Sequence, residues 1–371
     1  MTTLRDIGVA WMIVLCTWAA PLHALDRVAA SSQASRLWRL AAQEQATLEQ
    51  RGILLPDRTV SDYVQAVTDR LWEQVHSNLR SPTIKVVTDT RMEAYAYPNG
   101  YCLLTTGILS QIENEDQLAM ILAHELVHYA RQHTVLLYDH FQMSIPGTGL
   151  SYARQTRAAG IPTMQQKIDA AEYQADDEGL TILKAAGYCE AEVLPLMSNL
   201  NKSLQDQGST ETIQRLEKRI KDMRTIMGQT PERITCTSTA DGGRDFFLNR
   251  ITPALLANAQ AALNCGDWRQ ADRSISRFLM LKQDNARAYY LKGEIQRRRN
   301  DADVKNQCIG SYQKALEIDP EFPLAHRALG ELNYKAGRFQ TAKMHFEAFL
   351  SLAPQDHASE FIKGYLRQCQ N

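Results

Sequence analysis

The chain has 371 residues, of which 41 are basic and 42 are acidic, and 44% are hydrophobic. A chain of this length can form two or three hydrophobic cores, and the mixed composition is that of a globular protein. The net charge of −1 gives no support to nucleic-acid binding. The basic run at residues 297–299 is better explained as the solvated end of a helix.

The N-terminus has the pattern of a secretory signal peptide. A short apolar run at residues 7–20 follows a single basic residue, Arg5, and residues 21–24 offer a small residue at a cleavage point. The run is shorter than a comfortable membrane span. We therefore expect residues 1–24 to be removed from an exported protein. Asp6 weakens the basic n-region, so an uncleaved membrane anchor is the alternative.

The next segments predict an α+β domain that is mostly helical and carries a small sheet. Apolar side chains recur at helical spacing between residues 36 and 78. Residues 84–87 and 101–105 are short runs rich in β-branched or aromatic side chains, which are typical of strands.

His124, Glu125 and His128 form an H-E-x-x-H motif. Two histidines four residues apart lie on one face of a helix, where one tetrahedral zinc ion can take both imidazoles. Glu125 then lies beside the metal as a candidate general base. An amphipathic helix over about residues 114–133 is predicted by the spacing of Leu118, Ile121, Leu122, Leu126 and Tyr129. A buried helix that carries polar residues by chance is the alternative for the motif taken alone.

A catalytic zinc usually needs a third protein ligand, and the best candidate is Glu172 in a second predicted helix over about residues 165–186. Asp176 lies one turn further on the same face, where it can accept the outer N–H of a ligand histidine. His133 and His140 are alternative ligands, although His133 is five residues beyond His128 and points away from the face of the pair. The predicted site is one zinc ion per chain on His124, His128 and Glu172.

These motifs carry a family resemblance. H-E-L-V-H at residues 124–128 and E-Y-Q-A-D at residues 172–176 resemble the zinc metallopeptidases of family forty-eight, which include the HtpX and CaaX-prenyl protease groups. Residues 94–101 and 105–107 resemble that family's Asn-Ala-Phe-Ala-x-Pro-Gly-Gly strand and turn, and residues 175–180 and 186–188 resemble its second-helix signature. Over about residues 44–200, the resemblance implies a gluzincin-type domain in which Glu125 activates water and Asp176 supports a zinc ligand.

The resemblance also directs attention to the strand before the motif helix. A strand edge beside that helix would let an extended substrate pair its main chain there, and the expected substrate-binding residues are Ala94, Tyr95, Ala96 and Tyr97.

The chain departs from the family at two places. Glu93 stands where the family often has Asn. Relatives often carry a His-Pro pair six residues before an Arg-Ile or Arg-Leu pair, whereas here Ser209 and Thr210 precede Arg215-Leu216. Any role of that family histidine is therefore in doubt in this chain.

The C-terminal part predicts an all-α domain of about three tetratricopeptide repeats over residues 251–371. Pro320 precedes Pro354 by the 34 residues of this repeat. Small and large residues at the positions that interlock paired helices include Gly293, Tyr312, Ala315, Ala328, Gly330, Ala342 and Phe346, with a weaker copy at Ala259, Gly266, Ala271, Ile275 and Phe278. A polar, Gly-containing stretch predicts a linker or loop at residues 228–250 between this domain and a peptidase domain at residues 25–227.

A secretion signal, a metallopeptidase and C-terminal repeats together resemble the BepA-type periplasmic proteases of Gram-negative bacteria. The resemblance implies a periplasmic zinc metalloendopeptidase that hydrolyses misassembled or stalled outer-membrane proteins. Its repeats would dock envelope assembly machinery, and it is compatible with peripheral membrane association. The alternative is a repeat-based chaperone or scaffold with a latent or weakly active protease domain. Six cysteines lie beyond residue 24, and the sequence does not choose among their pairings.

Overall fold

The computed structural model describes residues 32–133, 135, 161–205, 210–228, 243–299 and 302–369. The chain divides into two compact units, Met1–Ile251 and Thr252–Asn371. The expected signal peptide lies outside the described residues. Within the described ranges, none of the helices combines the length and the apolar character that a membrane crossing requires.

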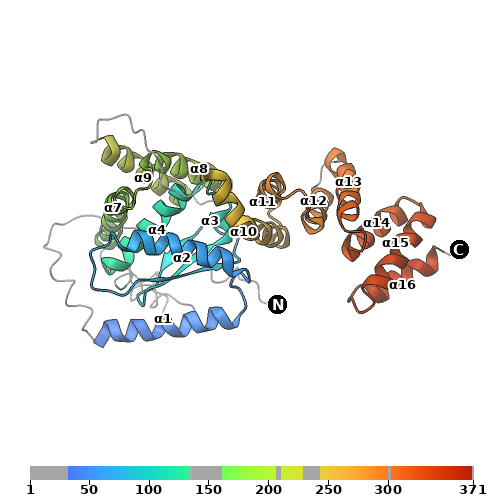
Figure 1. The fold of residues 1–371 in the computed structure, drawn as a ribbon, viewed down its shortest axis with the longest axis horizontal. Helices are drawn as coiled ribbons and strands as arrows, with labels where there is room; N and C mark the ends of the chain where they lie inside the picture. The colour runs from blue at the N-terminus through green and yellow to red at the C-terminus, as the bar shows by residue number, and fades with distance from the viewer. Residues whose placement is uncertain are drawn as a thin grey trace. The chain divides into compact units, whose positions relative to one another are not determined.

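The first unit contains helices around a small sheet, in agreement with the predicted α+β fold (Figure 1). Its elements in chain order are α1 (Ser32–Gln50), α2 (Arg58–Trp72), β1 (Thr83–Val87), β2 (Ala94–Ala96), β3 (Tyr101–Thr105), α3 (Thr106–Leu109), α4 (Glu115–Ala130), α7 (Ile161–Ala185), the 3₁₀ helix η3 (Glu190–Glu192), α8 (Val193–Gln205), α9 (Thr210–Gly228) and α10 (Gly243–Cys265).

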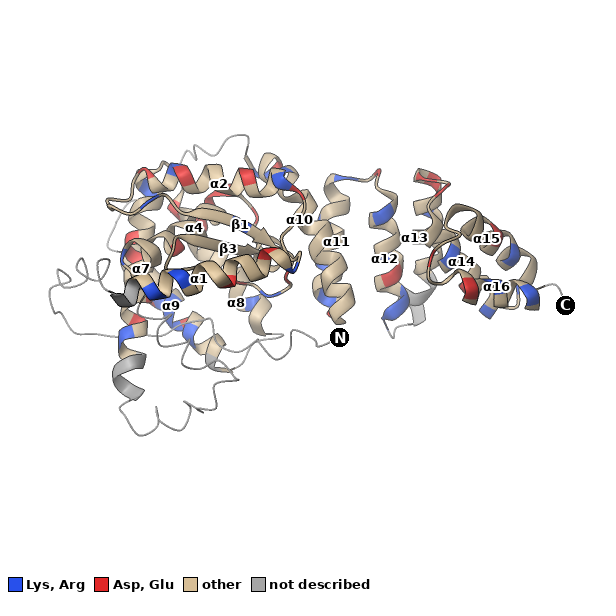
Figure 2. Ribbon diagram, turned by 90° about the horizontal axis from the view of Figure 1, so that it is seen from below, with Lys and Arg blue, Asp and Glu red and all other residues tan. Residues whose placement is uncertain are grey.

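The sheet has the strand order β1-β3-β2, in which β1 runs parallel and β2 antiparallel to the central β3. All five residues of β3 are buried, because helices cover both faces of the sheet. Leu37 and Ala41 of α1 pack with Leu103 on one face, and α2 and α4 contact the strands from the other (Figures 1 and 2). The short strand β2 is therefore an edge of the sheet and lies against α4.

Helix α4 is the central helix of this unit. Asn114 caps its N-terminus by accepting a hydrogen bond from the backbone N–H of Gln117 at 2.9 Å. The predicted amphipathic character is wrong, because nearly every residue of α4 is buried, including Glu115 and Asp116 in the first turn. The helix also ends at Ala130, earlier than predicted, and Gln132 follows it with a φ of 59°.

Helix α7 packs closely along α4, as the predicted helix at residues 165–186 requires. A Cβ at Gly179 would lie 3.3 Å from the backbone nitrogen of His124. Glycine at this position lets the two helices approach each other, which brings the side chains of α7 within reach of the H-E-x-x-H motif.

The expected linker at residues 228–250 is shorter at its C-terminal end, since α10 begins at Gly243. Phe247 of α10 is fully buried and its ring lies 6.3 Å from that of Tyr63 in α2, so apolar burial makes this segment part of the helix. Residues 229–242 lie outside the described residues. Four of the described cysteines, Cys102, Cys265, Cys308 and Cys369, carry free thiols, whereas Cys189 is disulfide-bonded.

The second unit consists of helices that pack in pairs, as the repeat pattern predicts. After the end of α10 they are α11 (Trp268–Leu281), α12 (Ala286–Arg298), α13 (Ala302–Ile318), α14 (Pro323–Lys335), α15 (Phe339–Leu352) and α16 (Ser359–Gln368). Basic and acidic residues are interspersed along these helices (Figure 2).

Two glycines show how the helix pairs interlock. A Cβ at Gly293 of α12 would lie 2.5 Å from the ring of Tyr312 in α13, and a Cβ at Gly330 of α14 would lie 2.5 Å from the ring of Phe346 in α15. Tyr312 and Phe346 are both fully buried. The small and large positions read from the sequence are therefore the contact points between the two helices of each pair.

Candidate metal centre

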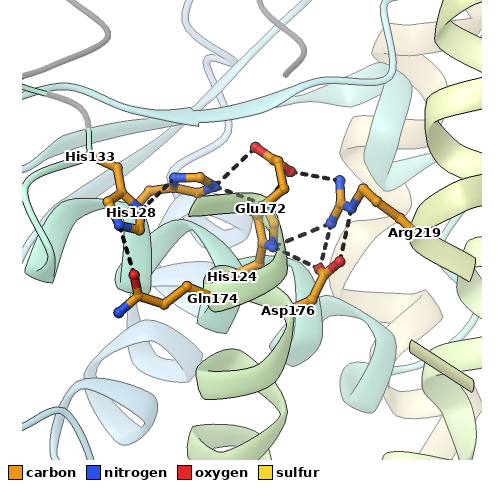
Figure 3. Close-up of polar contacts among 7 residues, drawn as sticks. All are labelled: His124, His128, His133, Glu172, Gln174, Asp176 and Arg219. Atoms are coloured by element: carbon orange, nitrogen blue, oxygen red, sulfur yellow. Dashed lines mark hydrogen bonds and ion pairs between the residues drawn. The ribbon is translucent and has the colours of Figure 1, made fainter. Parts of the chain in front are cut away.

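Three buried side chains from α4 and α7 converge on one point (Figure 3). The Nε2 atoms of His124 and His128 lie 3.1 Å apart. Glu172 completes the group, with Oε2 at 3.4 Å from Nε2 of His124 and Oε1 at 3.3 Å from Nε2 of His128. The histidines share a face because they are one turn apart on α4, and Gly179 lets α7 bring Glu172 alongside them.

These separations fit a metal ion. Four ligand atoms at about 2.05 Å from a tetrahedral ion lie about 3.3 Å from one another. The three measured distances of 3.1, 3.3 and 3.4 Å are close to this value. Among the described residues, this is the group of histidine, cysteine and acidic side chains that can hold a metal ion.

Asp176 lies behind His124, one turn after Glu172 on α7. Its Oδ1 is 3.0 Å from Nδ1 of His124, the nitrogen that faces away from Glu172. A carboxylate in this position holds the proton on Nδ1 and leaves Nε2 with a free electron pair.

Arg219 of α9 also enters the site, and the sequence analysis did not identify it (Figure 3). Its Nη2 and Nε lie 2.6 and 2.9 Å from the two oxygens of Asp176, and its Nη1 lies 3.1 Å from Oε2 of Glu172. The family pattern was aligned on Arg215-Leu216, one helical turn earlier, and no arginine was proposed for the site. The Arg-Ile pair at Arg219 repeats the Arg-Leu pair at Arg215, and this repetition was the signal available in the sequence.

The charges of the site favour a bound cation. Burial alone would raise the pKa of Glu172 and Asp176, but Arg219 and the motif histidines together outweigh burial and lower the pKa of both carboxyls. Burial and Arg219 lower the pKa of His124, yet the hydrogen bonds that His124 donates to Asp176 and Glu172 raise it to about 9. The two carboxylates therefore stabilise positive charge at the point where the histidines meet.

Glu125 follows His124 on α4 and is partly exposed, unlike its buried neighbours. Burial of its carboxyl group raises the pKa of Glu125 above its usual value, although the two motif histidines act in the opposite direction. A carboxylate with a raised pKa is a stronger base, which suits the role expected for this residue.

His133 does not join the three converging side chains, but it lies next to one of them. Its Nδ1 is 3.2 Å from Nδ1 of His128, and its Nε2 is 3.3 Å from Oε1 of Gln174. Burial and the neighbouring His128 lower the pKa of His133 to about 3. The other alternative ligand, His140, lies outside the described residues.

The expected substrate-binding residues form β2 and the turn after it, and two of them point into the core. Tyr97 is buried, and Tyr95 packs against the same hydrophobic cluster under α1. The backbone N–H of Tyr97 donates to Tyr101, and the carbonyl of Glu93 accepts from Thr105. Main-chain groups alternate in direction along a strand, so those of Ala94 and Ala96 face away from β3. The groups of β2 that a substrate could pair with are therefore the main-chain N–H and C=O groups of Ala94 and Ala96, and not the tyrosine side chains.

Comparisons with known proteins agree with this geometry. Residues 59–227 match Peptidase family M48, and residues 306–337 match a TPR repeat. A putative beta-barrel assembly-enhancing protease of Vibrio cholerae is 21% identical over 159 residues, which is 38% of this chain and 33% of that protein. The beta-barrel assembly-enhancing protease of Yersinia pestis is 23% identical over 172 residues (42% and 34%), and that of Escherichia coli K12 is 22% identical over 152 residues (36% and 31%).

The chain thus matches about a third of the length of these relatives. The family match spans α2 to α9, from which all the converging side chains come. The chain therefore carries a domain that matches peptidase family M48, at residues 59–227, and a C-terminal TPR repeat, at residues 306–337.

Proposed function

We propose that this chain is a zinc-dependent endopeptidase of the cell envelope. The observation that carries the proposal is the convergence of His124, His128 and Glu172 at the spacing of tetrahedral zinc ligands, on the helix that also carries Glu125. Two imidazoles and one carboxylate are a common protein ligand set of catalytic zinc, which keeps a fourth position open.

Zinc in this site supplies Lewis acidity, which polarises the scissile carbonyl and makes water more acidic. Glu125 takes a proton from the attacking water and then passes it to the nitrogen of the leaving amine. Asp176 holds His124 with Nε2 turned toward the ligand cluster. Arg219 forms ion pairs with both carboxylates and offsets one of their two negative charges, and its contact with Glu172 keeps that residue in place.

The substrate in this proposal binds as an extended strand beside β2. The N–H and C=O groups of Ala94 and Ala96 pair with its main chain, and the small side chains of both alanines leave room for it. Recognition by main-chain pairing accepts varied side chains, as a protease that clears faulty proteins requires.

The envelope location and the substrate class are supported by the relatives and by a disulfide. The relatives are named for enhancing β-barrel assembly. The disulfide at Cys189 favours an oxidising compartment, and the leader-like residues 1–24 are typical of exported chains. We infer that the substrates are misassembled or stalled outer-membrane proteins in the periplasm.

The TPR unit is expected to dock the assembly machinery or its clients, since helical repeats bind proteins and carry no chemistry of their own. In this proposal the peptidase domain takes residues 25–227 and the repeats take residues 251–371. The competing function is a scaffold with a latent protease, and catalytic inactivation separates the two.

The test is substrate capture with Glu125→Gln in a Gram-negative host. The variant should keep its metal and hold substrates, and crosslinking should recover outer-membrane β-barrel proteins from the envelope. His128→Ala, which loses the metal, is the matched control and should recover fewer. Recovery of cytoplasmic proteins alone would contradict the location and the substrate class. Full rescue of a deletion phenotype by Glu125→Gln would favour the scaffold.

A further inference from the structure

We infer that His133 is a positioning residue that fixes the tautomer of His128, through a chain of hydrogen bonds that begins at an ion pair on the protein surface. The inference rests on the zinc site of the proposed function. Its basis is the pair of facing nitrogens: Nδ1 of His128 and Nδ1 of His133 lie 3.2 Å apart, and both rings are buried (Figure 3). One of these two nitrogens must donate a proton and the other must accept it.

The residues at the surface end of this series of hydrogen bonds determine which of the two nitrogens donates. Arg131 and Glu178 form an exposed ion pair, with Nε 2.7 Å from Oε2. The ionised Glu178 can only accept hydrogen bonds, so the amide nitrogen of Gln174 faces it, at 2.7 Å from Oε1. The amide oxygen of Gln174 is then turned toward Nε2 of His133, at 3.3 Å.

The orientation of the Gln174 amide determines the proton position on His133, which in turn determines the proton position on His128. The oxygen of Gln174 can only accept, so His133 carries its proton on Nε2 and presents a free electron pair at Nδ1. His128 must then carry its proton on Nδ1, which leaves Nε2 with the electron pair that a metal needs. A doubly protonated His133 would instead force the proton of His128 onto Nε2 and remove the ligand.

The two motif histidines are therefore oriented by different means. Asp176 orients His124 through a carboxylate that Arg219 holds in place. His128 is oriented by the neutral imidazole of His133. The charged groups in this series of hydrogen bonds, Arg131 and Glu178, lie at the surface. His133 can reach this position because α4 ends at Ala130 and Gln132 adopts a φ of 59°, which turns the chain back beside His128.

The experiment compares His133→Phe, which has no acceptor, with His133→Asn, whose amide oxygen can replace Nδ1. Zinc affinity is measured by competition with a chelator on the full chain, and the tautomer of His128 is read from the ¹⁵N shifts of labelled histidine. We expect His133→Phe to bind zinc about 10- to 100-fold more weakly, as is usual for loss of a ligand's hydrogen-bond partner. His133→Asn should recover most of the affinity and the Nδ1–H tautomer of His128.

The outcomes separate this inference from the proposed function. A wild-type protein that binds no zinc contradicts the proposed function, and the inference fails with it. A wild-type protein that binds zinc no more tightly than His133→Phe overturns the inference alone, as does a folded His133→Asn that is as weak as His133→Phe. If His133→Phe does not fold, Gln174→Met tests the same series of hydrogen bonds, because Gln174 is partly exposed. It should give a mixture of His133 tautomers and zinc binding weaker by about threefold, and an unchanged spectrum and affinity would overturn the inference.

Discussion

Arg219 of α9 donates two parallel hydrogen bonds to Asp176 of α7. Nη2 lies 2.6 Å from Oδ1, and Nε lies 2.9 Å from Oδ2. The third nitrogen of the same guanidinium reaches Glu172 at 3.1 Å. A planar fork of this kind fits two carboxylates at once, which a lysine ammonium cannot do with the same geometry. One arginine thus holds a metal ligand and the residue that orients a second ligand.

We predict that Arg219→Met weakens zinc binding by about 10- to 100-fold, because Glu172 and Asp176 lose the group that holds them. The folded state should also lose about 3 kcal/mol in the absence of metal, since two buried carboxylates are left without their cation. Arg219→Lys should recover part of the stability but little of the affinity. Chelator competition and urea unfolding measure the two effects. The control is Lys221→Met at an exposed position of the same helix, and an equal loss in this control would show that the effect is not specific to Arg219.

The local part of this site could be predicted from sequence, and the long-range part could not. The histidine pair, Glu125 and the one-turn spacing of Glu172 and Asp176 all follow from helix periodicity. Arg219 lies on a third helix, and its approach depends on how α9 packs against α7, which no spacing encodes. The position of His133 was judged as if α4 continued through it, whereas the helix ends at Ala130 and the chain turns back. Likewise, the sequence predicted main-chain pairing at residues 94–97 but gave no sign that burial under α1 takes the side chains of Tyr95 and Tyr97 into the core.

The edge strand gives a prediction about substrate binding. Ala96→Pro removes a backbone N–H that faces away from β3, so the sheet should keep its own hydrogen bonds. We expect kcat/KM for extended peptides to fall by about tenfold, which corresponds to one lost hydrogen bond of about 1.4 kcal/mol. Zinc content and melting temperature should remain close to wild type. If peptide hydrolysis were unaffected while the variant remained folded, substrate pairing at Ala96 would have to be abandoned.

The interlocking glycines predict the stability of the repeats. Gly330→Ala places a methyl group against the fully buried ring of Phe346, so the repeat unit should lose about 1–3 kcal/mol from overpacking. Gly310→Ala on α13 is the matched control, because a Cβ there meets no atom within 4 Å. It should be neutral or stabilising by about 0.5–1 kcal/mol, as expected for alanine in a helix. Urea unfolding of the full chain measures both, and a Gly330→Ala variant as stable as Gly310→Ala would contradict the packing described here.

The same unit should become less stable in mild acid. Nδ1 of His345 lies 3.0 Å from Nδ1 of His326, and burial together with this neighbour lowers the pKa of His345 below 6.5. The unfolded chain therefore binds a proton that the folded chain resists, so stability is complete above pH 6.5 and falls as the pH drops below it. The free energy of unfolding should decrease less between pH 7.5 and pH 5.5 in His345→Gln than in wild type. His357→Gln, at a side chain that is 90% exposed, should behave as wild type, and identical pH profiles for all three proteins would refute the prediction.

The central claim is that one zinc ion on His124, His128 and Glu172 works with Glu125 as the base. The most direct measurement is to strip the purified full chain with a chelator, add zinc back in steps, and follow bound metal and peptide hydrolysis together. The rate should rise in proportion to bound zinc and level off at one ion per chain. Glu125→Gln should bind the same single ion and hydrolyse peptide about 10²- to 10⁴-fold more slowly. Full hydrolysis by the metal-free protein, or by Glu125→Gln, would contradict the account.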